Sequence, residues 1–258
     1  AAITAAQTSE RLPVPPSDDE IGRLGRTLNE MLARLEVAFK RERAFVSDAS
    51  HELRTPLAIL RTELELALRG EHSREELEAA LESAAEEVER LTQLAEDLLV
   101  IARSDQGRLP VRPQRLQAGT LLARVAGRFQ TRAKAEGRPL AADPSPGVEL
   151  TGDPARLEQA LANLVDNALT YGDGTVALTA RTADTHVELH VTDEGPGFPP
   201  DFLPRAFERF TRADEARSGG GSGLGLAIAE AVAAAHGGSA KARNGPLGAD
   251  VWITLPTE

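Results

Sequence analysis

The octapeptide Ser50-His51-Glu52-Leu53-Arg54-Thr55-Pro56-Leu57 is the stretch around which this chain is organised, because it sets a histidine beside a carboxylate within a long amphipathic helical pattern. Apolar residues before and after it recur at steps of three and four, which places them on one face of a helix. His51 lies off that face and is predicted to face solvent. Pro56 lacks a backbone N–H and clashes with the preceding turn, so a bend just after the histidine is predicted. Taken alone, His51 is interpreted as a surface histidine beside a helix kink.

The composition is that of a globular protein with an aliphatic core. Of the 258 residues, 41% are hydrophobic and only 3% aromatic, so Leu, Val, Ile and Ala must fill the interior. The net charge of -11 argues against nucleic acid as a partner, because that needs a basic face. Without cysteine there is no disulfide, thiolate nucleophile or cysteine–zinc site. The acidic balance also fits a cytoplasmic module. No apolar run approaches the roughly 18 residues of a membrane span, so the chain as given is predicted to be soluble.

The sequence on both sides of the octapeptide predicts two long helices joined by a short turn. The first carries an apolar seam and breaks at residues 69–72. Ser73 and Glu76 form a capping box that opens the second helix. One hairpin of residues 41–104 cannot cover both seams, whereas two hairpins can. We therefore predict an all-α antiparallel hairpin that forms a dimeric four-helix bundle, a homodimer. The seam residues are Leu53, Leu57, Leu60, Leu64 and Ala67, then Leu77, Leu81, Ala84, Val88, Leu91, Ala95, Leu98 and Ala102.

A third helical pattern precedes the hairpin. Residues 18–20 supply acids for a helix start. Apolar residues then alternate at steps of three and four, as in a coiled coil, at Ile21, Leu24, Leu28, Met31, Leu35 and Ala38. Such a seam indicates a partner helix, with a solvated helix hairpin as the alternative. Residues 19–24 and 29–31 resemble the second half of a HAMP linker, the module that joins a transmembrane helix to a cytoplasmic kinase. The resemblance covers residues 1–40 and implies the cytoplasmic portion of a longer sensor, anchored in the cell membrane upstream of residue 1.

A second domain is predicted after a linker at residues 105–113, where Gly107, Pro110 and Pro113 interrupt the helical periodicity. Residues 114–258 show helical patterns at 117–136, 153–171 and 223–236. Strand patterns lie at 148–150, 174–182 and 185–193, followed by two short strands that end at Leu255. Helices mixed with strands that are mainly joined as hairpins predict an α/β sandwich with its helices on one face.

Two asparagines on one predicted helix are the first chemical feature of this domain. Asn163 and Asn167 are four residues apart and therefore share a helix face. Asparagine carbonyl oxygens are suitable neutral ligands for Mg²⁺, which bridges phosphates and keeps several waters. Asparagine is also unfavourable within a helix. The pair therefore indicates either a metal site or a polar helix face.

Two glycine-rich stretches are the second feature. In Asp193-Glu194-Gly195-Pro196-Gly197 the glycines let the backbone approach a flat ligand, and the carboxylate can accept from an adenine amino group. An ordinary turn is the alternative. Residues 219–226 run from a flexible loop into a helix, and backbone amides at a helix start form a phosphate site. Residues 219–226 lack both a Walker A lysine and the βαβ context of a dinucleotide-binding motif. A plain glycine linker is the alternative interpretation of this stretch.

In order and spacing, these stretches resemble the N, G1 and G2 boxes of the histidine kinase catalytic domain, the Bergerat-type (GHKL) ATP fold shared with gyrase, Hsp90 and MutL. Residues 207–210 fit its F box, and the resemblance covers residues 110–258. It implies a mobile ATP lid at residues 199–222. It also implies that Asn167 ligates Mg²⁺, with Asn163 beside it. Asp193 would contact adenine, in a pocket shaped by Gly195 and Gly197. The residues implied near the phosphates are Gly221, Gly223, Leu224, Gly225, Arg209 and Arg212.

One position departs from that family pattern. Tyr171 matches the tyrosine of the N box, but Thr170 stands where the family often has lysine. One phosphate contact is therefore open, and an arginine from the lid is a candidate to replace it.

The octapeptide resembles, at all eight positions, the phosphoacceptor box of sensor histidine kinases. The resemblance implies that His51 attacks the γ-phosphate of Mg-ATP and that Glu52 orients the imidazole and takes its proton. A neutral imidazole nitrogen is a suitable nucleophile. An aspartate of a response-regulator receiver domain would receive the group next. Glu52 and Thr55 also match the Glu-x-x-Thr pattern with which this family positions water for phosphatase activity on the regulator.

Two alternatives stay open at this point: a non-kinase ATPase of the same fold, and a dimeric scaffold whose nucleotide site has decayed. The octapeptide argues against the first, because such an ATPase needs no phosphoacceptor. Asn167, Asp193 and the glycine loop argue against the second, because all are intact. Whether transfer runs within or between subunits depends on the handedness of the turn at residues 69–73, which hydrophobic periodicity does not specify.

Overall fold

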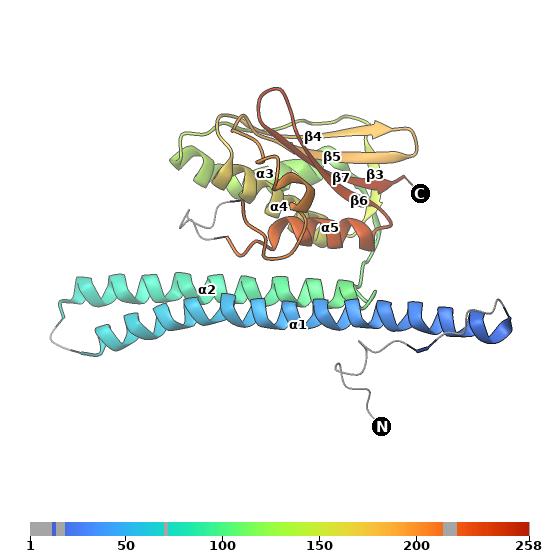
Figure 1. The fold of residues 1–258 in the computed structure, drawn as a ribbon. Coiled ribbons are helices and arrows are strands. Elements are labelled where there is room, and N and C mark those ends of the chain that lie inside the picture. Colours follow the sequence, from blue (N-terminus) through green and yellow to red (C-terminus); the bar gives the residue numbers. More distant parts are fainter. Residues whose placement is uncertain (1–11, 14–18, 70–71, 214–220, 258) are drawn as a thin grey trace. The chain divides into compact units, whose positions relative to one another are not determined.

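The computed structural model describes residues 12–13, 19–69, 72–213 and 221–257 (Figure 1). The chain divides into two compact units, Ala1–Glu87 and Val88–Glu258. Residues 1–11 and 14–18, residues 70–71 of the predicted turn, and residue 258 lie outside the described residues. So do residues 214–220 of the predicted ATP lid, which include Gly219 and Gly220 of the glycine-rich loop. Among the described helices, none is both long and apolar enough to cross a membrane.

Helix α1 runs from Glu20 to Ala67 and carries the octapeptide. It begins at Asp19, whose side chain accepts a 2.8 Å hydrogen bond from the Gly22 N–H. This bond satisfies a donor that has no partner within the helix. Pro56 is buried inside the helix, which continues past it to Ala67. The proline therefore removes one backbone hydrogen bond without ending the helix.

A capping box starts helix α2, which runs from Arg74 to Asp105. The Glu76 N–H donates to Ser73 Oγ at 3.2 Å, and the Ser73 N–H donates to the Glu76 carboxylate at 2.8 Å. The bond from the Ser73 N–H is the main reason why the pKa of Glu76 lies below its ordinary value. The capping box predicted from the sequence is confirmed.

Much of the predicted apolar seam is exposed in a single copy of the chain. In the first unit, Leu57 is 52% exposed, Leu64 42% and Leu81 63%. Fully burying a leucine side chain gains about 1.5–3 kcal/mol over leaving it in water. One copy of the hairpin therefore forgoes most of that gain along this face, as the sequence predicts.

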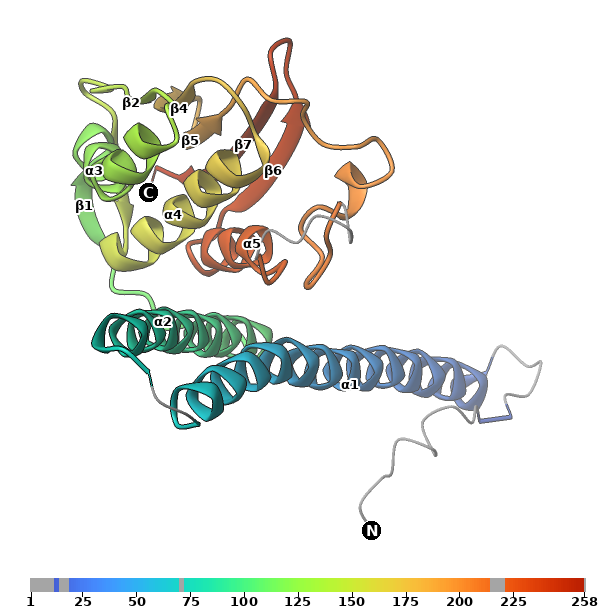
Figure 2. The same cartoon turned by 90° about the vertical axis from the view of Figure 1, so that its left-hand side faces the viewer.

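In the second unit, the described residues form a mixed sheet with helices on one face (Figure 2). The strand order is β2-β4-β5-β7-β6. The predicted α/β sandwich and its β4–β5 hairpin are confirmed. The strands are Leu140–Ala142 (β2), Val176–Ala183 (β4), His186–Thr192 (β5), Ser239–Asn244 (β6) and Ala249–Pro256 (β7). The helices are Ala118–Ala135 (α3), Pro154–Tyr171 (α4) and Gly225–Ala235 (α5), with a short 3-10 turn at Leu203–Arg205 (η1).

Strand β5 shows how side chains are sorted between the two faces of the sheet. Alternate residues of a strand point to opposite sides. Val187, Leu189 and Val191 are at most 2% exposed and form the core beneath the helices. The aliphatic residues that the composition offers therefore fill the layer between sheet and helices.

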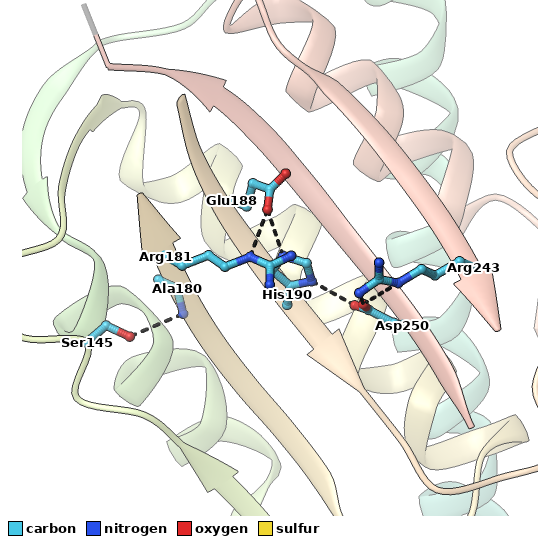
Figure 3. A network of polar contacts seen from close by, with 7 residues as sticks. All are labelled: Ser145, Ala180, Arg181, Glu188, His190, Arg243 and Asp250. Carbon is cyan, nitrogen blue, oxygen red and sulfur yellow. Dashed lines mark hydrogen bonds and ion pairs between the residues drawn. The ribbon is translucent and has the colours of Figure 1, made fainter. Parts of the chain in front are cut away.

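The opposite face of the sheet carries a polar cluster centred on His190 (Figure 3). His190 Nδ1 lies 2.7 Å from Asp250 Oδ1, and its Nε2 lies 3.2 Å from Glu188 Oε2. Arg243 reaches the other Asp250 oxygen at 2.7 Å. The His190 ring also stacks on Trp252, with ring centres 5.3 Å apart. The cluster ties β5, β6 and β7 together on the side away from the helices.

The sequence predicts β3, at residues 148–150, but does not predict the short strands β1 and β2. Gln114–Gln117 (β1) pairs antiparallel with Glu149–Gly152 (β3), and β2 pairs parallel with β4. Strands of three or four residues are too short to show an alternating pattern. Their pairing depends on partners that are distant in sequence, so only the folded chain defines them.

Candidate functional site

Helix α4 is the element to which the predicted nucleotide-binding stretches converge, and its start is firmly fixed. Asp153 Oδ1 accepts from the Ala155 and Arg156 N–H groups at 3.0 and 3.2 Å, and Pro154 follows it in the first turn. Asp153 Oδ2 also accepts from the Arg112 N–H at 2.9 Å. Burial raises the pKa of Asp153, but these three backbone donors outweigh it, and the pKa lies below its ordinary value.

The two predicted asparagines lie half-buried on α4, where the glycine-rich loop enters α5. A Cβ placed on Gly225, the first residue of α5, would lie 3.6 Å from Asn163 Cβ. Asn163 Nδ2 is buried and has no hydrogen-bond partner among the described residues. A buried amide without a partner loses free energy, which is the condition expected of a group whose partner is a ligand.

The described part of the glycine-rich loop is packed against Tyr171 and the F box. A Cβ on Gly221 would lie 2.8 Å from the Tyr171 hydroxyl. Gly223 has a φ of +68°, which favours glycine, and its carbonyl accepts from the Phe210 N–H at 3.0 Å. Leu224, fully buried, then anchors the start of α5. A side chain at Gly221 or Gly223 would therefore collide with the Tyr171 hydroxyl or with the Phe210 backbone.

Asp193 closes the far end of the site, beyond the last turn of α4. Its Oδ1 accepts from the Gly195 N–H at 2.8 Å. A Cβ on Gly172, which follows α4, would lie 2.5 Å from Asp193 Cγ. Burial raises the pKa of Asp193, partly offset by the Gly195 and Ala249 N–H groups and by the charge of Arg138.

A side chain that sequence reasoning missed holds the loop after Asp193. Gly197 has a φ of +71°, and a Cβ there would lie 2.6 Å from Asn244 Oδ1. Asn244 accepts from the Phe198 N–H at 2.7 Å and donates to the Phe198 carbonyl at 2.9 Å. Asn244 ends β6, 46 residues further along the chain, and nothing in its local sequence marks it.

The two arginines of the predicted lid differ in their surroundings. The Arg209 guanidinium forms a two-pronged ion pair with the carboxylate of Asp105, the last residue of α2, with Nη1 at 2.6 Å from Oδ2. Such fork-to-fork pairs are among the stronger charged contacts. Arg212 is half-buried just after Phe210. The carboxylate partner of Arg209 comes from 104 residues earlier, and no sequence signal identifies it.

The position that departs from the family pattern has a cationic neighbour. Arg132 Nη2 donates to the Thr170 hydroxyl at 3.1 Å, and its Nη1 lies 2.5 Å from Asp166 Oδ1. Arg132 belongs to α3, whereas the sequence pointed to the lid as the source of such an arginine.

The octapeptide belongs to the first unit. His51 is exposed, as predicted, while Glu52 is half-buried and Thr55 is exposed on the same stretch of α1. Pro56 of the same stretch is buried. The imidazole is therefore open to approach from solvent.

Three protein families match successive parts of the chain. Residues 1–37 match the HAMP domain, residues 41–107 the His Kinase A (phospho-acceptor) domain, and residues 152–258 the histidine kinase-, DNA gyrase B- and HSP90-like ATPase. The matches follow one another in the order that the sequence predicts.

Individual relatives agree with these matches. The chain is 43% identical to the "Probable sensor histidine kinase HK" of Mycobacterium tuberculosis over 82% of its own length and 52% of that protein. Curated relatives are thus matched over about half of their length. The solved structure of full-length ShkA in complex with AMPPNP is 32% identical, with a TM-score of 0.62, over 83% of this chain and 45% of that one. The mycobacterial sensor histidine kinase MprB is 32% identical, with a TM-score of 0.50, over 55% of this chain and 97% of that one. The chain belongs to the two-component sensor histidine kinases.

Proposed function

We propose that this chain is an ATP-dependent protein-histidine kinase that phosphorylates itself on His51 and passes the phosphoryl group to an aspartate of a response regulator. The observation that carries the proposal is the convergence on α4. Asn163 meets the start of α5, Tyr171 meets the glycine loop, and Gly172 meets Asp193. A second feature, the exposed His51 within its complete octapeptide, supplies an acceptor.

The roles proposed for the nucleotide site follow from its donors and acceptors. The Asp193 carboxylate accepts from the adenine amino group, and Gly195 and Gly197 keep side chains away from the base. The N–H groups at the start of α5, around Gly223 and Gly225, face the phosphates with the positive end of the helix dipole. The nucleotide of the ShkA complex, AMPPNP, is an analogue of the substrate that this assignment requires.

The residues present also fit a magnesium ion. Asn163 and Asn167 offer neutral amide oxygens, one turn apart on α4, and the amide of Asn163 lacks a protein partner at Nδ2. Rotation of that amide exchanges its nitrogen and oxygen. Bound Mg²⁺ would neutralise phosphate charge, the main requirement of phosphoryl transfer. Asn167 would hold it, with Asn163 beside it, and Arg212 of the lid is the second source of positive charge.

The transfer itself is assigned to the octapeptide. A neutral ring nitrogen of His51 forms a bond to the γ-phosphorus as the bond from phosphorus to the ADP oxygen breaks. Glu52 takes the proton that the imidazole releases. For hydrolysis of the regulator's aspartyl phosphate, Glu52 and Thr55 would position a water molecule that attacks the phosphorus, releasing inorganic phosphate and restoring the aspartate.

The exposed seam supports a homodimer as the working state. Leu57, Leu64 and Leu81 of the first unit would be covered by a second hairpin. The HAMP match supports a membrane-anchored parent protein, with these domains on the cytoplasmic side.

The test is phosphorylation with γ-labelled ATP. Wild-type chain should gain acid-labile, base-stable label, His51→Gln should gain none, and His72→Gln, which alters an exposed histidine of the same hairpin, should label normally. ATP hydrolysis without stable label would favour the non-kinase ATPase. Label retained by His51→Gln would overturn the proposal.

A further inference from the structure

Arg138 is a charged residue that lies outside the predicted boxes yet contacts the end of α4. It follows the last turn of α3, where Gly137 has a φ of +66°. The Arg138 N–H donates to the Ala133 carbonyl at 2.8 Å, and the Gly137 N–H donates to the Lys134 carbonyl at 3.1 Å. This glycine-terminated helix end fixes the Arg138 backbone and directs the residue toward α4.

The guanidinium of Arg138 binds backbone carbonyls in the last turn of α4 and in the loop that follows it; the Ala168 carbonyl also accepts from the Gly172 N–H at 3.0 Å. Its Nη1 donates to the carbonyls of Ala168 and Leu169 at 2.8 and 2.7 Å, and its Nε donates to the Gly174 carbonyl at 3.2 Å. A cation at a helix C-terminus is favourable because the exposed carbonyls carry partial negative charge. One side chain thus fixes the last turn of α4 and the loop that follows it.

That loop forms one wall around Asp193. A Cβ on Gly172 would lie 2.5 Å from Asp193 Cγ, so the loop backbone presses directly on the carboxylate. The Glu194 N–H donates to the Asp173 carbonyl at 2.9 Å, and the Thr175 N–H donates to the Glu194 carboxylate at 2.8 Å. A shift of the loop is therefore transmitted to the Asp193 side chain.

Two further observations distinguish Arg138 from an ordinary helix cap. Its charge acts on Asp193 in the direction that favours the ionised carboxylate. Its Nη2 is buried without a hydrogen-bond partner among the described residues. A buried N–H without a partner costs free energy, so stability alone does not explain an arginine at this position.

We propose that Arg138 is a positioning residue for adenine recognition: it holds the loop at residues 172–175 so that the Asp193 carboxylate meets the 6-amino group of the base. This role rests on the proposed function, because it assumes that Asp193 reads adenine. Arginine suits this positioning role because the rigid, forked guanidinium reaches several carbonyls at once, whereas lysine offers a single point charge.

The test compares two nucleotides that differ only at the group Asp193 would read. ATP and purine riboside triphosphate, which lacks the 6-amino group, compete with a fluorescent ATP analogue for the wild-type chain, Arg138→Gln and Arg138→Lys. Arg138→Gln should weaken ATP binding about tenfold, because small misplacements of a positioned group have large effects. It should change binding of the amino-free analogue less than about twofold. Arg138→Lys should fall between Arg138→Gln and wild type.

Arg124→Gln is the matched control, because Arg124 also joins α3 to α4 through a 3.1 Å ion pair with Glu158. It should leave both affinities unchanged. Equal losses for the two nucleotides in Arg138→Gln, or no loss for either, would overturn the positioning role. If Arg138→Gln does not fold, the same comparison of the two nucleotides in Arg138→Lys tests the positioning role. Failure of the wild-type chain to bind ATP would instead overturn the proposed function, and this role with it.

Discussion

Asp97 of α2 should lower the stability of the second unit at neutral pH. The residue is 7% exposed, and Gln93 Nε2 donates to its Oδ1 at 2.9 Å. Burial raises the pKa of Asp97 from 3.8 to about 6, although hydrogen bonds from Gln93 and Gln159 oppose the shift. The charged carboxylate is therefore a destabilising group that replacement by asparagine should relieve.

The size and sign of the effect follow from proton linkage. Between pH 3.8 and 6 the folded chain holds the Asp97 proton more tightly than the unfolded chain does, so stability falls as the pH rises through this window. The difference amounts to about 3 kcal/mol once the pH exceeds 6, at 1.36 kcal/mol for each pKa unit. Asp97→Asn should thus be more stable than wild type by about 3 kcal/mol at pH 7.5. Its advantage should disappear as the pH falls toward 4.

The measurement is urea unfolding at a single protein concentration between pH 4.5 and 7.5, followed by fluorescence. Trp252 is the single tryptophan of the chain and lies in β7, so it reports on the unit that contains Asp97. Glu96→Gln, which removes the exposed neighbouring carboxylate, is the control and should change stability by no more than about 0.5 kcal/mol. An Asp97→Asn advantage that is absent at pH 7.5, or that does not vary with pH, would refute the reasoning.

Three further predictions concern single contacts. Gly223→Ala should weaken ATP binding more than about tenfold in a titration, because the φ of +68° and the 2.8 Å distance from an added Cβ to Phe210 C exclude a side chain. The control is Gly127→Ala, in open space on α3, which should raise the free energy of unfolding in urea by up to about 1 kcal/mol. Asp250→Asn should cost about 3 kcal/mol at pH 7. Burial raises the pKa of Asp250, but His190 and Arg243 lower it by more, so the pKa lies below its ordinary value. The stability advantage of the wild type should therefore fade as the pH drops through that lowered pKa. Asp105→Asn should weaken the ion pair with Arg209 and raise the initial rate of autophosphorylation. An unchanged rate would show that this ion pair does not limit autophosphorylation.

Local sequence was sufficient wherever structure depends on neighbours along the chain. Ser73 and Glu76 cap α2 as predicted, because a capping box needs only residues three apart. Asp153 and Pro154 start α4, and the hairpin of β4 and β5 forms where two alternating runs adjoin. The boxes are recognisable for the same reason: glycines and asparagines at fixed spacing are needed by a turn or helix face, whatever surrounds it.

The sequence by itself determined the long helices, the hairpin strands and the order of the domains, and it singled out the residues that are proposed to bind a nucleotide. Tertiary structure alone decided which distant groups complete the site. Arg138 reaches the carbonyls of α4, Asn244 clamps the loop after Asp193, and Asp105 pairs with Arg209. These partners lie more than 25 residues apart, where no periodicity or cap signal operates. Their contacts exist because packing of the helices and the sheet brings them within hydrogen-bonding distance, and the free energy of that packing is distributed over the whole core.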